Sequence, residues 1–493
     1  MIKYQEMLES ATVDFWLTRF LFQRSLAFIY LLGFLIAANQ FPALAGERGL
    51  LPSQLFVQRV SFWDAPSLFF FHCSDRVFIS AASLGVVLSL IALFGFSDSY
   101  GMLFSVATWS LLWVLYLSFV NIGQVFYGFG WETLLLETGF LAIFLGSKNV
   151  APPQVVIWLL RWVLFRVMFG AGMIKLRADP CWKDLTCMYY YYETQPLPNP
   201  LSWYFHYLPR FIHKASVVFN HFVELIVPWG IFAPRPICYF AGGFTILFQL
   251  ILILSGNLSW LNYITIVLCI PCFDDAVLSR ILTMDIPAVA PPSFSYKIVL
   301  GMLSLLIVVL SLKPARNLFS RRQLMNASFE PFHLVNTYGA FGSVTRERME
   351  ILIQGTNDQI VSDSTDWRDY ELKGKPGDVN RRPCLVSPYH YKLDWQMWFA
   401  AMSGYARHPW FLNLVGKLLE GDKAILKLLA NNPFPEKPPR FIRAELYQYH
   451  FTEPGDEPRH RWTRARVGEY LVPLSLDNPS FRDLRKRMGW ISH

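Results

Sequence analysis

The sequence feature that most constrains the fold is a series of long apolar windows in the first 312 residues. A helix needs about 20 mostly apolar residues to cross the ~30 Å hydrocarbon layer of a bilayer. Charges or prolines shorten or interrupt three of the windows, which predicts tilted, broken or re-entrant elements there. The pattern predicts a multi-pass α-helical membrane bundle of about nine crossings, with seven or eight as the alternatives. The windows lie near residues 24–42, 76–96, 101–121, 131–147, 155–174, 217–234, 237–255, 258–273 and 296–312, and the interrupted ones are 131–147, 217–234 and 258–273.

Composition agrees with a membrane environment. The chain is 53% hydrophobic and 16% charged, whereas an ordinary soluble domain carries about 25% charged residues. The net charge of +8 does not indicate nucleic acid binding, because Lys and Arg are scattered and form no basic stripe with interleaved aromatics. We therefore expect membrane lipids, and not nucleic acid, around this chain.

From residue 313 the sequence turns polar and its periodicity changes. Two stretches, 391–406 and 408–432, have the three- and four-residue apolar spacing of helices. Five short stretches rich in aromatic and β-branched residues, bounded by Gly, Pro and Asp, predict strands. We expect a helical transmembrane domain over 1–312 and a soluble α+β domain, mostly antiparallel β, over 313–493. The predicted strands are 332–341, 346–355, 366–374, 441–451 and 461–471.

The two ends of the bundle can be told apart by loops and sequons. An odd number of crossings places the loop at 175–215 and the carboxy-terminal domain together, opposite the amino terminus. Asn257 and Asn326 begin N-x-S sequons on that same side, and both are glycosylation candidates. These features predict that the loop and the domain face the lumen or the cell exterior.

One intramembrane ion pair can be predicted from depth alone. If windows 131–147 and 155–174 form an antiparallel hairpin centred near residue 151, Glu137 lies level with Arg166. Charges inside a bilayer usually pair to hold helices together, and a catalytic carboxylate is the alternative. We expect a structural Glu137–Arg166 pair.

Familiar catalytic and metal-binding motifs are missing from the sequence. It contains no nucleophile elbow, no phosphate-binding glycine loop and no H-E-x-x-H. His221 and Glu224 share a helix face, but no second set of ligands of that spacing accompanies them. Cys269 and Cys272 have C-x-x-C spacing within an apolar helix, where thiol chemistry is disfavoured. We therefore expect neither a metal nor a cofactor. A transporter would predict inverted repeats, and we see none.

The segment from Phe169 to Pro200 leaves an apolar helix and continues as an aromatic, proline-punctuated loop. Lys175 is expected at the water boundary, where long basic side chains reach out of the lipid. Cys181 and Cys187 share this loop and are candidates for a disulfide. The aromatic residues, Trp182 and the tyrosines 189–192, suit either an ordered interfacial loop or a docking surface for another protein.

Six motifs in one order carry a resemblance to a known family: "YGFGWETLLLETGFL", "DPCWKDLTCM" with "YETQPLPNP", "SGNLSWLN", "CFDDA", "VNTYGAFGSVTRER" and "RRPCLVSPYHYKLDWQMWFAA". Together they closely resemble the lipase maturation factor family, from about Phe15 to the end. The resemblance implies a multi-pass protein, in animals of the endoplasmic reticulum membrane, that assists the folding and assembly of secreted lipases such as lipoprotein lipase. Bacterial members would occupy the inner membrane.

Such a factor would act as a chaperone without being an enzyme. We expect it to bind apolar surface on unfinished lipases through aromatic residues of the loop and the domain. The candidate client-binding residues are Trp182, Tyr189, Tyr190, Tyr192, Tyr338, Phe341, Trp395 and Trp398.

A more distant likeness supplies a rival function. The helix end "AGMIKL" resembles a motif in the membrane region of vitamin K-dependent carboxylases, in which a lysine at the matching position serves as a base. The likeness implies Lys175 as the catalytic residue of a membrane enzyme, provided that burial lowers its proton affinity.

Overall fold

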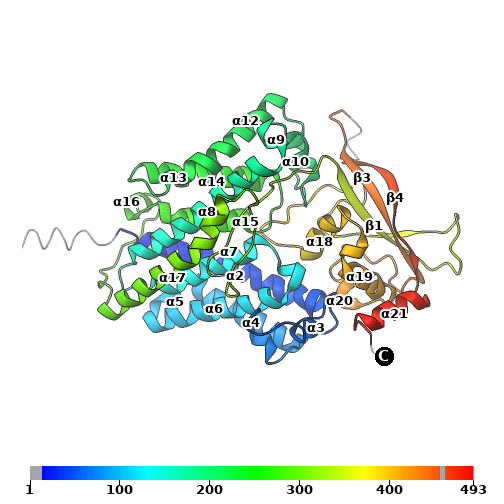
Figure 1. Ribbon diagram of the computed structural model, residues 1–493, viewed down its shortest axis with the longest axis horizontal. Coiled ribbons are helices and arrows are strands. Elements are labelled where there is room, and N and C mark those ends of the chain that lie inside the picture. The colour runs from blue at the N-terminus through cyan, green and yellow to red at the C-terminus, as the bar shows by residue number, and fades with distance from the viewer. Residues whose placement is uncertain (1–13, 456–460, 492–493) are drawn as a thin grey trace, which may run out of the picture.

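The computed structural model describes residues 14–455 and 461–491. Helices form a bundle at one end of the long axis, and a β-sheet with its covering helices forms the other end (Figure 1). The bundle and the sheet domain meet at the helices α18 and α19.

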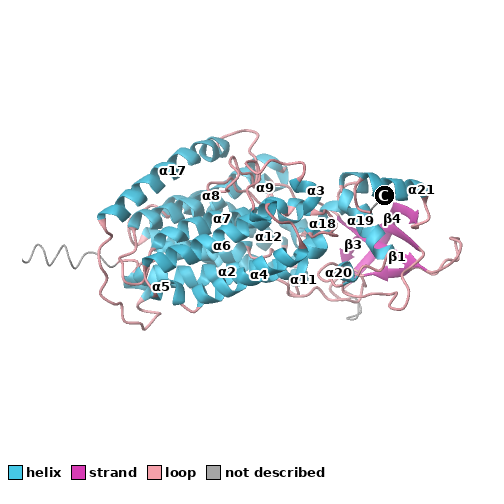
Figure 2. Cartoon of the chain, turned by 90° about the horizontal axis from the view of Figure 1, so that it is seen from below, coloured by secondary structure: helices cyan, strands magenta, loops and turns pink. Residues whose placement is uncertain are grey.

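Among the described residues, six helices are long and apolar enough to cross a membrane by length and composition. Each coincides with one of the strong apolar windows in the sequence. In Figure 2 the last of them, α17, lies along one edge of the bundle, and most of its side chains are exposed. The six helices are α2 (Trp16–Ala45), α4 (Asp75–Leu93), α6 (Met102–Ile122), α8 (Gln154–Ala178), α14 (Ile237–Ser255) and α17 (Phe294–Leu318).

The three interrupted windows fold as shorter helices within the bundle, and the count of about nine crossings stays a prediction. Two prolines account for two of the interruptions, because proline has no backbone N–H for the helical ladder. Pro228 lies at the start of α13, and Pro271 follows the end of α15. The segments are α7 (Gly130–Ala142), the series α12 (Arg210–His221), η4 (Phe222–Ile226) and α13 (Val227–Gly230), and α15 (Leu261–Cys269).

Short helices make up much of the connecting segments. They are α3 (Ser53–Val57), α5 (Phe96–Ser99), α9 (Pro180–Lys183), α10 (Met188–Thr194), α11 (Ser202–His206) and α16 (Asp275–Leu278).

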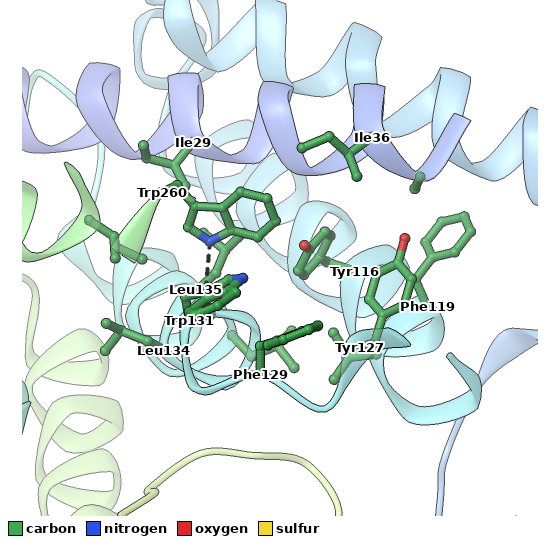
Figure 3. Close-up of a cluster of buried hydrophobic side chains, with 14 of the residues drawn as sticks. Ile29, Ile36, Tyr116, Phe119, Tyr127, Phe129, Trp131, Leu134, Leu135 and Trp260 are labelled. Carbon is green, nitrogen blue, oxygen red and sulfur yellow. Dashed lines mark hydrogen bonds between the residues drawn. The ribbon is translucent and has the colours of Figure 1, made fainter. Parts of the chain in front are cut away.

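Large aromatic side chains fill the centre of the bundle (Figure 3). Trp260, just before α15, lies against α7 and donates its indole N–H to the carbonyl oxygen of Trp131 at 3.3 Å. Tyr116 of α6 makes edge-to-face contacts with Tyr30 and Phe34 of α2, with ring centroids 5.8 and 5.4 Å apart. Such ring pairs add to the stability gained by burying the rings.

The carboxy-terminal domain contains one antiparallel four-stranded sheet with the order β2-β1-β3-β4. Four of the five predicted strands are present, and so are the two predicted helical regions. The sequence did not predict the last helix, α21. The elements are β1 (Arg348–Thr356), β2 (Arg368–Tyr370), β3 (Phe441–Phe451), β4 (Trp462–Leu474), α18 (Lys392–Ala401), α19 (Pro409–Leu419), α20 (Lys423–Leu426) and α21 (Pro479–Arg487).

The fifth predicted strand, at 332–341, was wrong. This segment makes only an isolated bridge between Ser328 and Asn336 and otherwise runs as irregular chain. Its aromatic and β-branched residues face the membrane bundle and no neighbouring strand, and Val335 and Tyr338 are buried there. The apolar pattern therefore reflected burial, which strands and packed loops share.

Bundle and sheet domain share one continuous core. Helix α17 continues to Leu318, past the predicted boundary at 312, and the ring of Trp395 in α18 lies 4.9 Å from that of Trp131 in α7. The loop after α8 also contacts the sheet: the indole of Trp203 donates to the carbonyl of Thr452 at 2.8 Å. Loop and sheet domain therefore lie at the same end of the bundle.

Candidate functional site

The loop that follows α8 is a folded part of the core. A disulfide joins Cys181 to Cys187. Trp182, between them, is 2% exposed and donates its indole N–H to the carbonyl oxygen of Phe341 at 3.0 Å. The ring of Tyr191 meets the ring of Phe341 edge-on at 5.3 Å. The aromatic residues thus join the loop to the segment that precedes the sheet.

This burial corrects the predicted client-binding surface. Four of its eight residues are buried and cannot contact a client in this structure: Trp182, Tyr192, Tyr338 and Trp395. The other four are half-buried: Tyr189, Tyr190, Phe341 and Trp398. The indole of Trp398, for example, donates to the carbonyl of Thr194 at 3.0 Å. The physical reason is that large amphipathic rings serve equally well in a core, where their polar atoms find backbone partners.

Lys175, the residue proposed as a base, is buried among protein side chains, and its place at the water boundary stays a prediction. Its Nζ lies 2.5 Å from Oε1 of Glu224 and 4.9 Å from the ring centroid of Trp182. Gly172 permits this approach of α8 to η4, because a Cβ there would lie 2.6 Å from Leu225. The ammonium is held by a carboxylate and a ring, so the geometry supports an ion pair between helices better than a free base.

The structure places Arg166 of α8 in a buried ion pair with Glu137 of α7. Residues of the irregular segment complete the network: the hydroxyl of Tyr338 donates to Glu137 at 2.6 Å, and the backbone N–H of Asn336 donates to it at 3.0 Å. Arg166 in turn donates to the carbonyl oxygen of Asn336 at 2.6 Å. Sequence reasoning missed these two contributors, because it assigned their segment to a strand.

A second buried network joins the bundle to the sheet domain. Nζ of Lys392, at the start of α18, lies 2.6 Å from Oε1 of Glu132 in α7, and both side chains are fully buried. The hydroxyl of Tyr116 donates to the same carboxylate. Nζ also lies 3.6 Å from the ring centroid of Tyr127. His390 completes the group, with Nδ1 3.7 Å from Oε1 of Glu132. No local pattern could have paired residues 260 positions apart.

The buried His390 predicts a specific acid sensitivity. Burial, with the nearby Lys392 ammonium, lowers the pKa of His390 to about 3, whereas in an unfolded chain it would be about 6.5. Below about pH 6.5 the unfolded state therefore binds a proton at His390, whereas the folded state does not. The free energy of unfolding falls as the pH drops below this value. Between pH 7.5 and pH 4.5, protonation at this histidine lowers the free energy of unfolding by on the order of 3 kcal/mol. The thermal midpoint of the purified protein should fall less steeply with pH over this range for His390→Asn than for the unmodified protein.

The exposed His72 provides the matched control. The thermal midpoint of His72→Asn should change with pH as steeply as that of the unmodified protein. Equal slopes for all three proteins would contradict the assignment to His390.

The structure separates the two sequons. Asn257 is 1% exposed; its amide donates to the carbonyls of Pro198 and Cys384 and its oxygen accepts from the backbone of Val386. A glycan on Asn257 would require these bonds to be broken, so the contacts of the folded protein argue against this candidate. Asn326 is exposed and stays a candidate for glycosylation.

No group of three or more potential metal ligands occurs within residues 14–455 and 461–491. Nε2 of His221 bonds with the carbonyl oxygen of Trp182 at 3.0 Å. Cys269 and Cys272 are buried, and the thiol of Cys269 donates to the carbonyl of Thr265 at 3.2 Å. These side chains therefore have structural partners within the bundle.

An open cleft of about 500 Å³ lies at the end of the bundle that carries the sheet domain. Three parts of the chain form it: the α3 region, the α6–α7 junction and the segment after α17. Sequence reasoning missed it because these parts are far apart in the chain. Its lining residues are Phe56, Val60, Trp63, Asp64, Ala65, Val120, Asn121, Gln124, Tyr127, Gly128, Phe129, Thr133, Asn326, Ser328, Glu330, Pro331 and His333.

Asn121, near the end of α6, forms hydrogen bonds with the other two parts of the chain at the cleft. Its amide donates to the carbonyl oxygens of Pro66 at 2.8 Å and Pro331 at 3.1 Å. Its oxygen lies 2.8 Å from Nε2 of His333. One side chain thereby fixes two loops to a membrane helix, so the cleft is preformed.

The outer wall of the cleft continues into exposed aromatic residues. Trp63 is 75% exposed and Phe71 is 81% exposed, while Phe62 contacts both rings at 5.4 and 6.1 Å. The local signal was present in "SFWDAPSLFFFHC" at 61–73, an aromatic run outside the apolar windows. Exposed apolar patches of this kind mark contacts with proteins or membranes.

Comparison with known proteins places these features in a family. Residues 17–280 match the lipase maturation factor transmembrane domain, and residues 334–473 match the lipase maturation factor C-terminal domain. Lipase maturation factor 1 of Mus musculus is 45% identical over 95% of this chain and 88% of its own length. The Homo sapiens protein of that name is 44% identical over 97% and 91%, and lipase maturation factor 2 of Xenopus laevis is 31% identical over 96% and 84%. No solved structure matches the chain. Two matching domains and nearly full-length similarity show that this chain belongs to the lipase maturation factor family.

Proposed function

We propose that this chain is a membrane-embedded chaperone that binds apolar surface on secreted lipases while they fold and assemble. The observation that carries the proposal is the preformed cleft together with the aromatic wall, by which we mean the exposed Trp63 of its lining and the exposed Phe71 next to it. Binding to unfinished proteins requires accessible apolar area and no reacting group. Relatives named for lipase maturation indicate the class of client.

The proposed location is the endoplasmic reticulum membrane, with the sheet domain in the lumen. The Cys181–Cys187 disulfide supports this orientation, because disulfides persist in oxidising compartments. Asn326 supports it as an exposed sequon at the same end. There the cleft would meet secretory cargo before its export.

Removing the aromatic wall should impair lipase maturation without affecting the fold. Trp63→Ala and Phe71→Ala together delete two exposed rings that pack mainly on their neighbours. An interface aromatic contributes about 1–2 kcal/mol or more, so we expect active lipase secretion to fall roughly tenfold in cells that depend on this chain. Secreted lipase activity, normalised to the amount of the membrane protein, is the measurement.

Phe294→Ala is the matched control. Phe294 is also largely exposed, but it begins α17 at the opposite end of the bundle. Normal secretion with the control and reduced secretion with the double variant would support the proposal. Normal secretion with both would exclude this wall as the client-binding surface.

A further inference from the structure

The cleft is acidic in a basic protein. Within the described part of the chain, its lining includes the carboxylates of Asp64 and Glu330 but neither Lys nor Arg, although the whole chain has a net charge of +8. Asp64 is exposed. Glu330 accepts the backbone N–H of Phe332 at 2.7 Å and that of Leu334. The nearest cation in the sequence, Arg59, is exposed and lies outside the lining.

An exposed aromatic ring accompanies these carboxylates. Trp63 lines the cleft and is 75% exposed, whereas Tyr127 and Phe129, which also line it, are buried, and Nζ of Lys392 already lies 3.6 Å from the centroid of the Tyr127 ring. A ring face attracts a cation through its quadrupole, and a carboxylate in the same cleft adds Coulomb attraction. The combination favours a ligand that presents a positive charge on an apolar stem.

We infer that the cleft recognises a lysine or arginine side chain carried by an apolar segment of the unfinished client. This inference rests on the proposed function and names the part of the client that enters the cleft. The long stem of either residue lies against the ring of Trp63 while its charged end reaches Asp64 and Glu330. The side-chain oxygens of Gln124 and Ser328, which also line the cleft, can accept hydrogen bonds from the peptide backbone.

Size and polarity favour a peptide over a lipid headgroup. The cleft of about 500 Å³ lies within the range of sites for molecules of several hundred daltons. Its polar lining also suits backbone amides, which a trimethylammonium headgroup lacks.

The test uses the full chain in nanodiscs and two synthetic peptides of identical sequence, apolar and aromatic, with either arginine or neutral citrulline at the centre. We expect the arginine peptide to bind about tenfold more tightly than the citrulline peptide. This ratio corresponds to a cation interaction of modest strength. Asp64→Asn should reduce this preference severalfold, because it removes an exposed charge from the cleft. Asp285→Asn, an exposed acid outside the cleft, should leave the preference intact.

Equal binding of the two peptides would overturn the inference. Displacement of either peptide by soluble phosphocholine, with no preference for arginine, would instead identify a headgroup site and would also overturn it. Lipase secretion separates the two levels of the proposal. An Asp64→Asn variant that keeps the preference for the arginine peptide, together with a Trp63 and Phe71 double variant that still reduces lipase secretion, would support the chaperone function. The same result would exclude recognition of a positive charge by the cleft.

Discussion

Arg166→Met should strongly reduce the amount of folded protein. The substitution removes the cation from a pair in which both side chains are about 1% exposed. Glu137 would keep the hydroxyl of Tyr338 and the amides of Asn336 as donors. Breaking a buried pair by deleting one partner costs about 3–5 kcal/mol, because the remaining charge is left uncompensated. We expect folded protein, measured by size-exclusion chromatography in detergent, to fall at least tenfold.

Two further variants show whether the charge is responsible. Glu137→Gln combined with Arg166→Met removes both charges and should recover a large part of the loss. Arg368→Met breaks an exposed pair with Asp366 and should cost less than about 1 kcal/mol. A double variant that is no better folded than Arg166→Met would show that packing, and not the unpaired carboxylate, causes the loss.

Lys392→Met should uncouple the sheet domain from the bundle. Lys392 is the cation that neutralises the buried Glu132 across the junction, and it also donates to the carbonyl oxygen of Phe126 at 3.2 Å. Its loss leaves Glu132 without a cation at the junction, at a cost of about 3–5 kcal/mol. We expect a lower thermal midpoint, and limited proteolysis should cut faster near His390, which lies beside Glu132.

The partner variant, Glu132→Gln, allows a double-mutant cycle across the junction. A coupling energy of about 1–3 kcal/mol between the two substitutions is expected for charges in direct contact. Lys423→Met, at an exposed lysine of the same domain, is the control and should leave both measurements unchanged. Strict additivity of the two junction variants would show that the ion pair does not hold the domains together.

Much of the local structure could be predicted from the sequence because it depends on neighbouring residues. Apolar runs of about 20 residues predict membrane helices whatever surrounds them, and α2 and α8 lie where such runs occur. Short stretches rich in aromatic or β-branched residues and bounded by Gly, Pro and Asp predicted β1 and β3. The contact of Glu137 with Arg166 also follows from local geometry, because the two windows adjoin in the chain and antiparallel neighbours match in depth.

The candidate site was less accessible to sequence reasoning. Tyrosine and tryptophan are enriched at interfaces, but they pack equally well inside. Tyr192 was expected on a surface and is buried, whereas Trp63 was overlooked and is exposed. What decides between the two outcomes is whether a distant segment covers the ring, as the segment containing Phe341 covers Trp182. The spacing of residues along the chain does not indicate whether a distant segment covers a ring.

The sequence by itself determined that this chain has an apolar helical part and a polar part with antiparallel strands, because periodicity and composition act over a few residues. Only the tertiary structure decided that the two parts share a core, that Lys392 neutralises Glu132, and that three remote segments enclose an acidic aromatic cleft. The physical reason is that a buried charge or an exposed ring is defined by its partners in space. Those partners are brought together by the free energy of the whole fold, not by their order in the chain.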